Sequence, residues 1–128
     1  MEYVAIVVML ALLQFVYFSV EVGRARGRFN VPVPATSGNE LFERFFRAQQ
    51  NTAEQLLVFL PAVYACGLYA SEALATVLGL LFVLGRMLYF RGYTNPEKNR
   101  TVGFALGLLA NVVMILATLY SLGMSLLS

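Results

Sequence analysis

One short polar face carries the side chains of this chain that are best suited to chemistry. Its polar residues are Arg44, Arg47, Asn51 and Glu54. They follow one another at intervals of three or four residues, so on a helix they share an arc of about 80°. The segment runs without a break into an apolar run that begins at Gln55. Ionisable side chains at the boundary of a lipid-soluble segment are costly, and they usually mark a site.

Two further polar faces follow later in the chain. Arg86, Tyr89 and Tyr93 are spaced to share one side of a helix, and Arg100 opens another helix that also carries Asn111. Because such faces are costly to expose to lipid, we expect them to converge on one cavity. Each also has a simpler interpretation. The tyrosines suit an interfacial aromatic belt, Arg86 suits a topology signal that contacts lipid headgroups, and Asn111 suits an interhelical hydrogen bond.

A ligand that fits these groups would carry carboxylates, an amine and peptide groups. Arginine binds a carboxylate through two parallel hydrogen bonds, and a glutamate such as Glu54 accepts from an ammonium group. An arginine beside a thiol lowers the pKa of the thiol and favours the nucleophilic thiolate. Glutathione meets this description, as do other zwitterions. Neither a metal nor a nucleic acid is expected as a partner.

The composition predicts one all-α membrane domain, residues 1–128. Hydrophobic residues make up 59% of the chain and charged residues 12%, against about 45–50% and about 25% in soluble domains. Four segments are apolar and nearly long enough to cross a bilayer, which takes about 20 residues per helix. We expect an integral membrane four-helix bundle with up-down-up-down topology. Its helices are expected at about residues 3–22, 40–70, 73–93 and 100–127. The first should remain as an anchor rather than be cleaved as a signal peptide.

The placement of basic residues predicts the orientation of the bundle. All nine lysine and arginine residues lie in or beside the first loop, about residues 23–39, or the third loop, about residues 91–100. Basic loops stay in the cytosol. We therefore expect loops one and three to be cytosolic and both termini to lie on the opposite side. The membrane would be a bacterial inner membrane or the endoplasmic reticulum.

Two strings of residues carry a family resemblance. The first runs from Phe42 to Glu54 and the second from Gly85 to Tyr93, and Arg100 follows at a matching spacing. Together they resemble the membrane-associated proteins in eicosanoid and glutathione metabolism (MAPEG), over nearly the whole chain. The resemblance implies a homotrimer that binds glutathione between neighbouring subunits near the cytosolic face. A hydrophobic co-substrate or lipid would reach a groove between subunits from the bilayer.

The resemblance also implies roles for individual residues. Arg100 corresponds to the arginine that stabilises the glutathione thiolate. The positions that correspond to glutathione contacts are Arg26, Arg47, Gln49, Asn51, Glu54, Tyr89 and Tyr93. The implied activity is transfer of glutathione to a hydrophobic electrophile, or glutathione-dependent reduction of a lipid hydroperoxide. Gly27 and Gln55 depart from the pattern of some members, which have a second arginine and a tyrosine there.

Two other classes of function fit parts of the sequence. One is a non-catalytic membrane protein that binds a lipid and presents it to a partner. Four residues that occur together favour an enzyme over this class: Arg47, Asn51, Tyr93 and Arg100. The other class is a small multidrug exporter, which also carries an intramembrane glutamate. In those exporters the glutamate lies within the first helix, whereas Glu21 lies at the end of the first helix here, so this class is the weakest.

Overall fold

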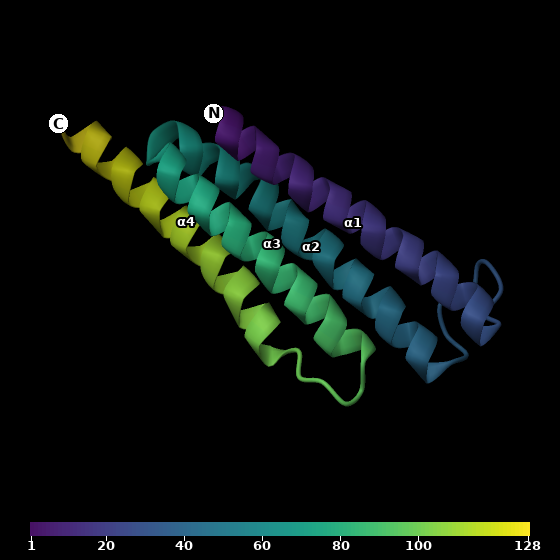
Figure 1. The fold of residues 1–128 in the computed structure, drawn as a ribbon. Helices are drawn as coiled ribbons and strands as arrows, with labels where there is room; N and C mark the ends of the chain where they lie inside the picture. Colours follow the sequence, from purple (N-terminus) through teal and green to yellow (C-terminus); the bar gives the residue numbers. More distant parts are fainter.

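Four α-helices joined by short loops make up the whole chain. The computed structural model describes all 128 residues and contains no β-strand. The helices are α1 (Glu2–Phe29), α2 (Glu40–Tyr69), α3 (Glu72–Thr94) and α4 (Thr101–Leu127). All four are long and apolar enough to cross a membrane. The two termini and the α2–α3 turn lie at one end of the molecule, and the two longer loops lie at the other (Figure 1).

Side-chain caps determine where the two central helices begin. The Asn39 side chain accepts a hydrogen bond of 3.0 Å from the backbone N–H of Phe42, and Ser71 accepts one of 3.1 Å from that of Leu74. Both caps have an extended backbone, which is the usual geometry before a first helical turn. α2, α3 and α4 begin and end within one residue of the ranges expected from the sequence.

α1 is longer than the sequence indicated. We expected a loop from residue 23 onward, but the helix continues to Phe29. Arg26 and Arg28 lie in its last turn, where cations interact favourably with the carbonyl end of the helix. Asn30 then takes the left-handed conformation, with φ 56° and ψ 46°, that ends many helices. The arginines expected in the first loop therefore lie on a helix, which sets the directions of their side chains.

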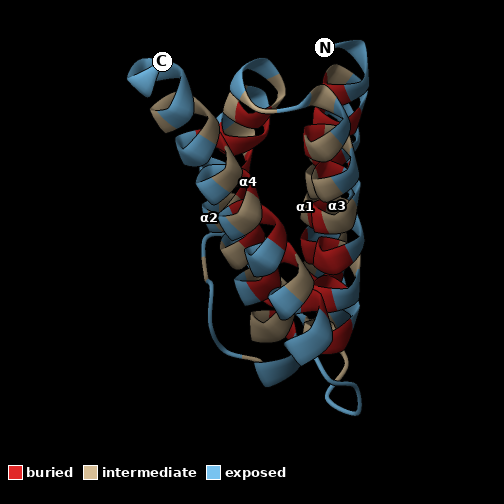
Figure 2. Ribbon diagram, turned by 90° about the vertical axis from the view of Figure 1, so that its left-hand side faces the viewer, coloured by how far each residue is buried: buried red, intermediate tan, exposed pale blue.

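α2 and α3 form the centre of the bundle. α1 packs against both of them and so does α4, whereas α1 and α4 do not touch each other. Figure 2 shows the buried residues along the faces that the helices turn toward one another, with exposed residues over the outer faces. Phe59 stacks on Phe82 and Phe18 stacks on Phe90, each pair with its ring centroids 4.0 Å apart. These two pairs join α2 and α1 to α3.

The outer surface of the bundle carries many large apolar side chains. Examples that are more than half exposed are Leu13, Val20, Leu57 and Leu116. In water an apolar surface of this extent would promote association, whereas hydrocarbon solvates it well. The surface therefore agrees with helices that lie in lipid.

Candidate functional site

Arg86 is a fully buried cation at the interface of α2 and α3. Its exposed fraction is 0%, and no carboxylate pairs with it. Its Nη2 donates hydrogen bonds of 2.8 Å to Asn51 Oδ1 and of 2.8 Å to Thr52 Oγ1. Its Cζ lies 4.1 Å from the centroid of the Tyr89 ring. Because a buried charge without an acidic partner is costly, these polar and aromatic contacts are what stabilise the guanidinium there.

Three glycines let α4 approach α3 closely beside this arginine. A Cβ atom added to Gly103 would lie 2.7 Å from the carbonyl oxygen of Gly85, and one added to Gly85 would lie 2.8 Å from the backbone nitrogen of Gly107. Residues without a side chain allow helix backbones in a membrane to lie this close. At Gly107 an added Cβ would meet Arg86 Cδ at 3.4 Å. The first turns of α4 thus close one side of the space around Arg86.

Tyr89, Tyr93 and Arg100 continue the contacts of Arg86 toward the start of α4. The ring centroids of Tyr89 and Tyr93 are 5.5 Å apart, and Arg100 Cζ lies 4.8 Å from the centroid of the Tyr93 ring. The carbonyl oxygen of Tyr93 accepts a hydrogen bond of 3.3 Å from Arg44 Nη1 of α2. Tyr89 is buried, Tyr93 is half-buried and Arg100 is exposed. Side chains from three helices therefore meet at this end of the bundle.

A polar cavity of about 380 Å³ opens beside Arg100. Its lining contains no apolar side chain and consists of Arg44, Gly92, Glu97, Lys98, Asn99, Arg100 and Thr101. Three of these side chains are cationic and one is anionic, so the cavity attracts anions. The first turn of α4 forms part of its wall and carries no acidic residue, which also favours a negative group. The cavity suits an anionic group, such as a thiolate or a carboxylate.

The polar face predicted on α2 is divided by the fold. Asn51 contacts Arg86, and Arg44 contacts the end of α3. Arg47 and Glu54 are exposed, and neither makes a hydrogen bond or an ion pair within the chain. At 100° per residue they lie about 60–80° round the helix from Arg44, on the side away from α3. The expectation that these faces converge on one cavity is therefore only partly met within a single chain.

Arg26 and Gln49 make their contacts elsewhere in the molecule. Arg26 Nη1 donates to two carbonyl oxygens of the first loop, at 2.6 and 3.4 Å, and its Cζ lies 4.9 Å from the centroid of the Phe42 ring. Gln49 Nε2 donates a hydrogen bond of 2.8 Å to Ser19 Oγ, which joins α2 to α1. The predicted site residues that one chain does bring together are Asn51, Tyr89, Tyr93 and Arg100.

Arg86 is the residue of this cluster whose predicted role differs from its place in the structure. A contact with lipid headgroups was expected because basic residues near a membrane surface commonly set the topology. The structure buries it instead, between the polar pair Asn51-Thr52 and the Tyr89 ring. A signal was present, since Arg86 follows Gly85 and shares a helix face with Tyr89. A glycine beside an arginine within a spanning helix indicates close packing rather than a lipid-facing position.

Asn111 of α4 makes the interhelical hydrogen bond that was expected of it. Its Nδ2 donates to Gln55 Oε1 at 3.4 Å. Asn111 is buried, and its Oδ1 has no partner within the chain. The contact joins α2 to α4 one turn deeper in the bundle than Asn51.

The chain belongs to the MAPEG family, whose sequence profile matches residues 3–120. An uncharacterised protein of Synechocystis sp. is 42% identical to it over 92% of this chain and 86% of its own length. Microsomal glutathione S-transferase 2 of Homo sapiens is 40% identical over 94% of this chain and 81% of its own length. Leukotriene C4 synthase of Bos taurus is 35% identical over 94% of this chain and 79% of its own length. The family and the four apolar helices together define a multi-pass membrane protein.

Proposed function

We propose that the protein is a membrane-bound glutathione transferase that acts on hydrophobic electrophiles. The observation that carries the proposal is the series of contacts from Asn51 through Arg86, Tyr89 and Tyr93 to Arg100. These contacts join residues from three helices whose chemistry suits a zwitterionic thiol peptide. Relatives named as a glutathione S-transferase and as leukotriene C4 synthase, 40% and 35% identical, support the same class of activity.

The arginines of the proposed site complement the charge of glutathione. Glutathione has two carboxylates and one ammonium group, so it carries net negative charge at neutral pH. We assign its carboxylates to Arg26 and Arg47, which can each form two parallel hydrogen bonds, and its ammonium group to Glu54. Gln49 and Asn51 would bind its peptide groups. The tyrosines of α3 would then line the space between the peptide and the thiol.

The proposed reaction depends on a cation beside the glutathione thiol. Arg100 would favour the thiolate by direct electrostatic attraction, and the released proton would pass to water. The sulfur then attacks an electrophilic carbon, a carbon–sulfur bond forms, and the leaving group departs with the bonding electron pair. With a lipid hydroperoxide, two glutathione molecules would instead be oxidised to the disulfide while the peroxide is reduced to an alcohol and water.

A second copy of the chain would complete the site. Arg47 and Glu54 are exposed and have no partner within the chain, which is costly on the surface of a membrane bundle. In the proposed homotrimer these side chains, with Arg26 and Gln49, face a cavity shared with a neighbouring copy. The electrophile would enter from the bilayer along the groove between copies.

The proposed orientation places the site on the cytosolic side. The helices would cross the membrane in alternating directions, with the basic loops in the cytosol and both termini opposite. Cytosolic glutathione would then reach the cavity directly, while its hydrophobic partner arrives from the lipid.

Binding and turnover of the purified protein test this function. The detergent-solubilised chain should bind glutathione, seen by calorimetry, and conjugate it to chlorodinitrobenzene. Arg100→Ala should abolish most of the turnover, whereas Arg91→Ala, an exposed arginine outside the cavity, should retain it. No binding at millimolar glutathione would overturn the proposal. Binding without turnover in the native chain would indicate a non-catalytic, lipid-presenting member of the family, and cumene hydroperoxide would show whether peroxide reduction accompanies conjugation.

A further inference from the structure

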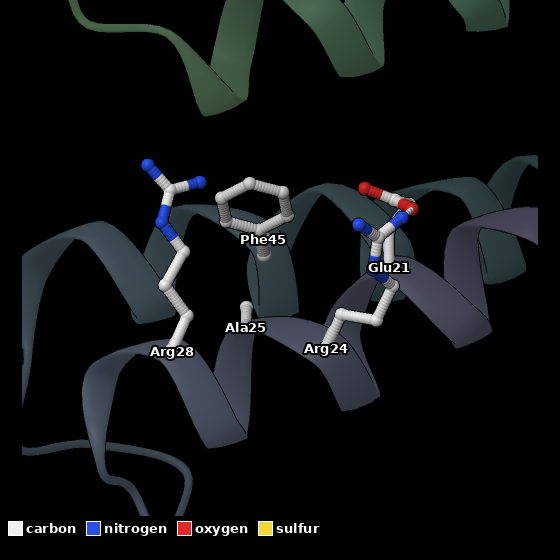
Figure 3. Close-up of a pocket in the computed structure, with 5 residues that line it drawn as sticks. All are labelled: Glu21, Arg24, Ala25, Arg28 and Phe45. Carbon is white, nitrogen blue, oxygen red and sulfur yellow. Dashed lines mark hydrogen bonds and ion pairs between the residues drawn. The ribbon is translucent and has the colours of Figure 1, made fainter.

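A second basic cavity lies between α1 and α2, apart from the site assigned to glutathione. It has a volume of about 150 Å³ and is lined by Glu21, Arg24, Ala25, Arg28 and Phe45. Figure 3 shows Arg28 on one side of the Phe45 ring and Arg24 with Glu21 on the other, with these side chains extending to the same side. An aromatic ring therefore separates two guanidinium groups that open onto one space.

This cavity continues toward the end of α3. A neighbouring cavity of about 350 Å³ shares Arg28 and Phe45 with it. The lining of the neighbouring cavity is completed by Phe29, Leu41, Thr94, Asn95 and Pro96. Arg28 thus lies between two adjoining spaces, and together they leave room for a group larger than a single ion.

The charges in the cavity leave one arginine without a partner. Arg24 Nη1 pairs with Glu21 Oε1 at 3.0 Å. Arg28 makes no ion pair, and its Cζ lies 5.1 Å from the centroid of the Phe29 ring. The cavity therefore holds two cations and one anion. The fork of an arginine matches the geometry of a phosphate, which can accept two parallel hydrogen bonds from it.

The face of α1 below the cavity is apolar and exposed. Leu13, Tyr17 and Val20 are 65%, 45% and 53% exposed. At 100° per residue they share an arc of about 80° with Arg24 and Arg28. The rise from Leu13 to Arg24 is about 16 Å at 1.5 Å per residue, which is about half of the 30 Å hydrocarbon core. The charged cavity therefore lies at one end of an apolar stripe that is about as long as one acyl chain.

We propose that the cavity between Arg24 and Arg28 binds the phosphate group of an anionic phospholipid. The acyl chains lie along the stripe of Leu13, Tyr17 and Val20, and the phosphate lies beside the two guanidinium groups. Basic pockets between membrane helices at the cytosolic side are suited to anionic headgroups. A free phosphate ion would satisfy the arginines but would leave the stripe without an occupant, so the combination of the two surfaces selects a lipid.

Titration of the purified full chain with short-chain lipids tests the assignment. The probes are dioctanoyl phosphatidylglycerol, dioctanoyl phosphatidylcholine and inorganic phosphate, with bound species counted by native mass spectrometry. Phosphatidylglycerol should bind about tenfold more tightly than either other probe. Arg28→Gln should weaken that binding about tenfold, since it removes a charged hydrogen-bond donor. Glu21→Gln should strengthen it, because the carboxylate both repels the phosphate and competes for Arg24.

The control is Arg91→Gln, which removes the same charge from an exposed position of α3 that lines neither cavity. Its lipid affinity should equal that of the native chain, and equal losses in Arg28→Gln and Arg91→Gln would overturn the proposal. Inorganic phosphate binding as tightly as phosphatidylglycerol would identify a soluble phosphate and overturn the lipid assignment. Circular dichroism of Arg28→Gln and of the charge-conserving variant Arg28→Lys verifies that both variants fold. Glutathione binding should be unchanged in Arg28→Gln, so the outcome is separate from that of the proposed transferase activity.

Discussion

Arg86 Nη2 donates a hydrogen bond of 2.8 Å to Asn51 Oδ1, and this contact joins a buried cation of α3 to a proposed glutathione ligand of α2. Because the Oδ1 atom of Asn51 is held by the guanidinium, its Nδ2 group remains free to donate to a ligand. The same Arg86 nitrogen also bonds Thr52 Oγ1 at 2.8 Å, which limits its movement. If Asn51 binds glutathione as proposed, Arg86 would act as a positioning residue for Asn51 rather than as a group that touches the substrate.

Replacing Arg86 with methionine should raise the KM for glutathione about tenfold and leave the KM for the electrophile unchanged. Methionine fills much of the same volume, but it releases the Asn51 amide, which then donates in no fixed direction. The measurement is steady-state kinetics in detergent, combined with a cycle that includes Asn51→Ala. In the Arg86→Met background, Asn51→Ala should have little further effect, because the two residues act as one unit. Additive losses would contradict the positioning role.

Replacing Arg100 with alanine should lower kcat about a hundredfold, which is the loss expected when one group that stabilises a developing or held negative charge is removed. The KM for glutathione should change by only a few fold, because the tripeptide keeps its other contacts. The ultraviolet absorbance of the bound thiolate reports the cause directly and should disappear in Arg100→Ala. Arg100→Lys keeps the charge and should retain part of that absorbance. A native thiolate signal in Arg100→Ala would assign thiolate stabilisation to another residue.

Hydrophobic patterning was sufficient to predict four lipid-crossing helices, because each helix must satisfy its own backbone in the bilayer. The end of α1 was misplaced because Gly23 and Gly27 among arginines resemble a loop, although Asn30 is the residue that ends the helix. The residues of α2 were predicted to share a face, but an arc of 80° is too broad to show which members turn toward α3. The burial of Arg86 depends on a close approach of α3 and α4, and that approach involves glycines far apart in the sequence.

Replacing Gly103 with alanine should destabilise the bundle strongly. The added Cβ would lie 2.7 Å from the carbonyl oxygen of Gly85, and a backbone atom in a helix has no room to move aside. α4 would have to separate from α3, so we expect a loss of about 3 kcal/mol in unfolding free energy, as for other overpacked cores. Gly123→Ala is the matched control, since nothing lies within 4 Å of its added Cβ. Thermal aggregation of the two variants in detergent gives the comparison, and equal melting temperatures would contradict the close contact.

Replacing Arg47 or Glu54 with glutamine should weaken glutathione binding about tenfold without changing stability. Both side chains are exposed and make no hydrogen bond or ion pair within the chain, so in the proposed site their loss removes only contacts to glutathione. Gln49→Ala is an informative contrast, because Gln49 donates to Ser19 at 2.8 Å and its loss should lower the melting temperature. Calorimetry with glutathione and thermal melting separate the two effects. A large drop in melting temperature for Arg47→Gln, with unchanged binding, would point to subunit contact alone.

Cysteine labelling should place the two ends of the bundle on opposite sides of the membrane. The chain has a single cysteine, Cys66, which is buried in the core, so the background from a membrane-impermeant maleimide should be low. Ser125→Cys lies at the end that holds both termini, and Ser37→Cys lies in the first loop; both positions are exposed. Because the arginines cluster at the loop end, Ser125→Cys should react in intact bacterial cells, whereas Ser37→Cys should react only after permeabilisation. In sealed microsomes, whose cytosolic face points outward, Ser37→Cys should react and Ser125→Cys should not. Labelling of Ser37→Cys in intact cells would reverse the orientation and remove the direct access of cytosolic glutathione to Arg100.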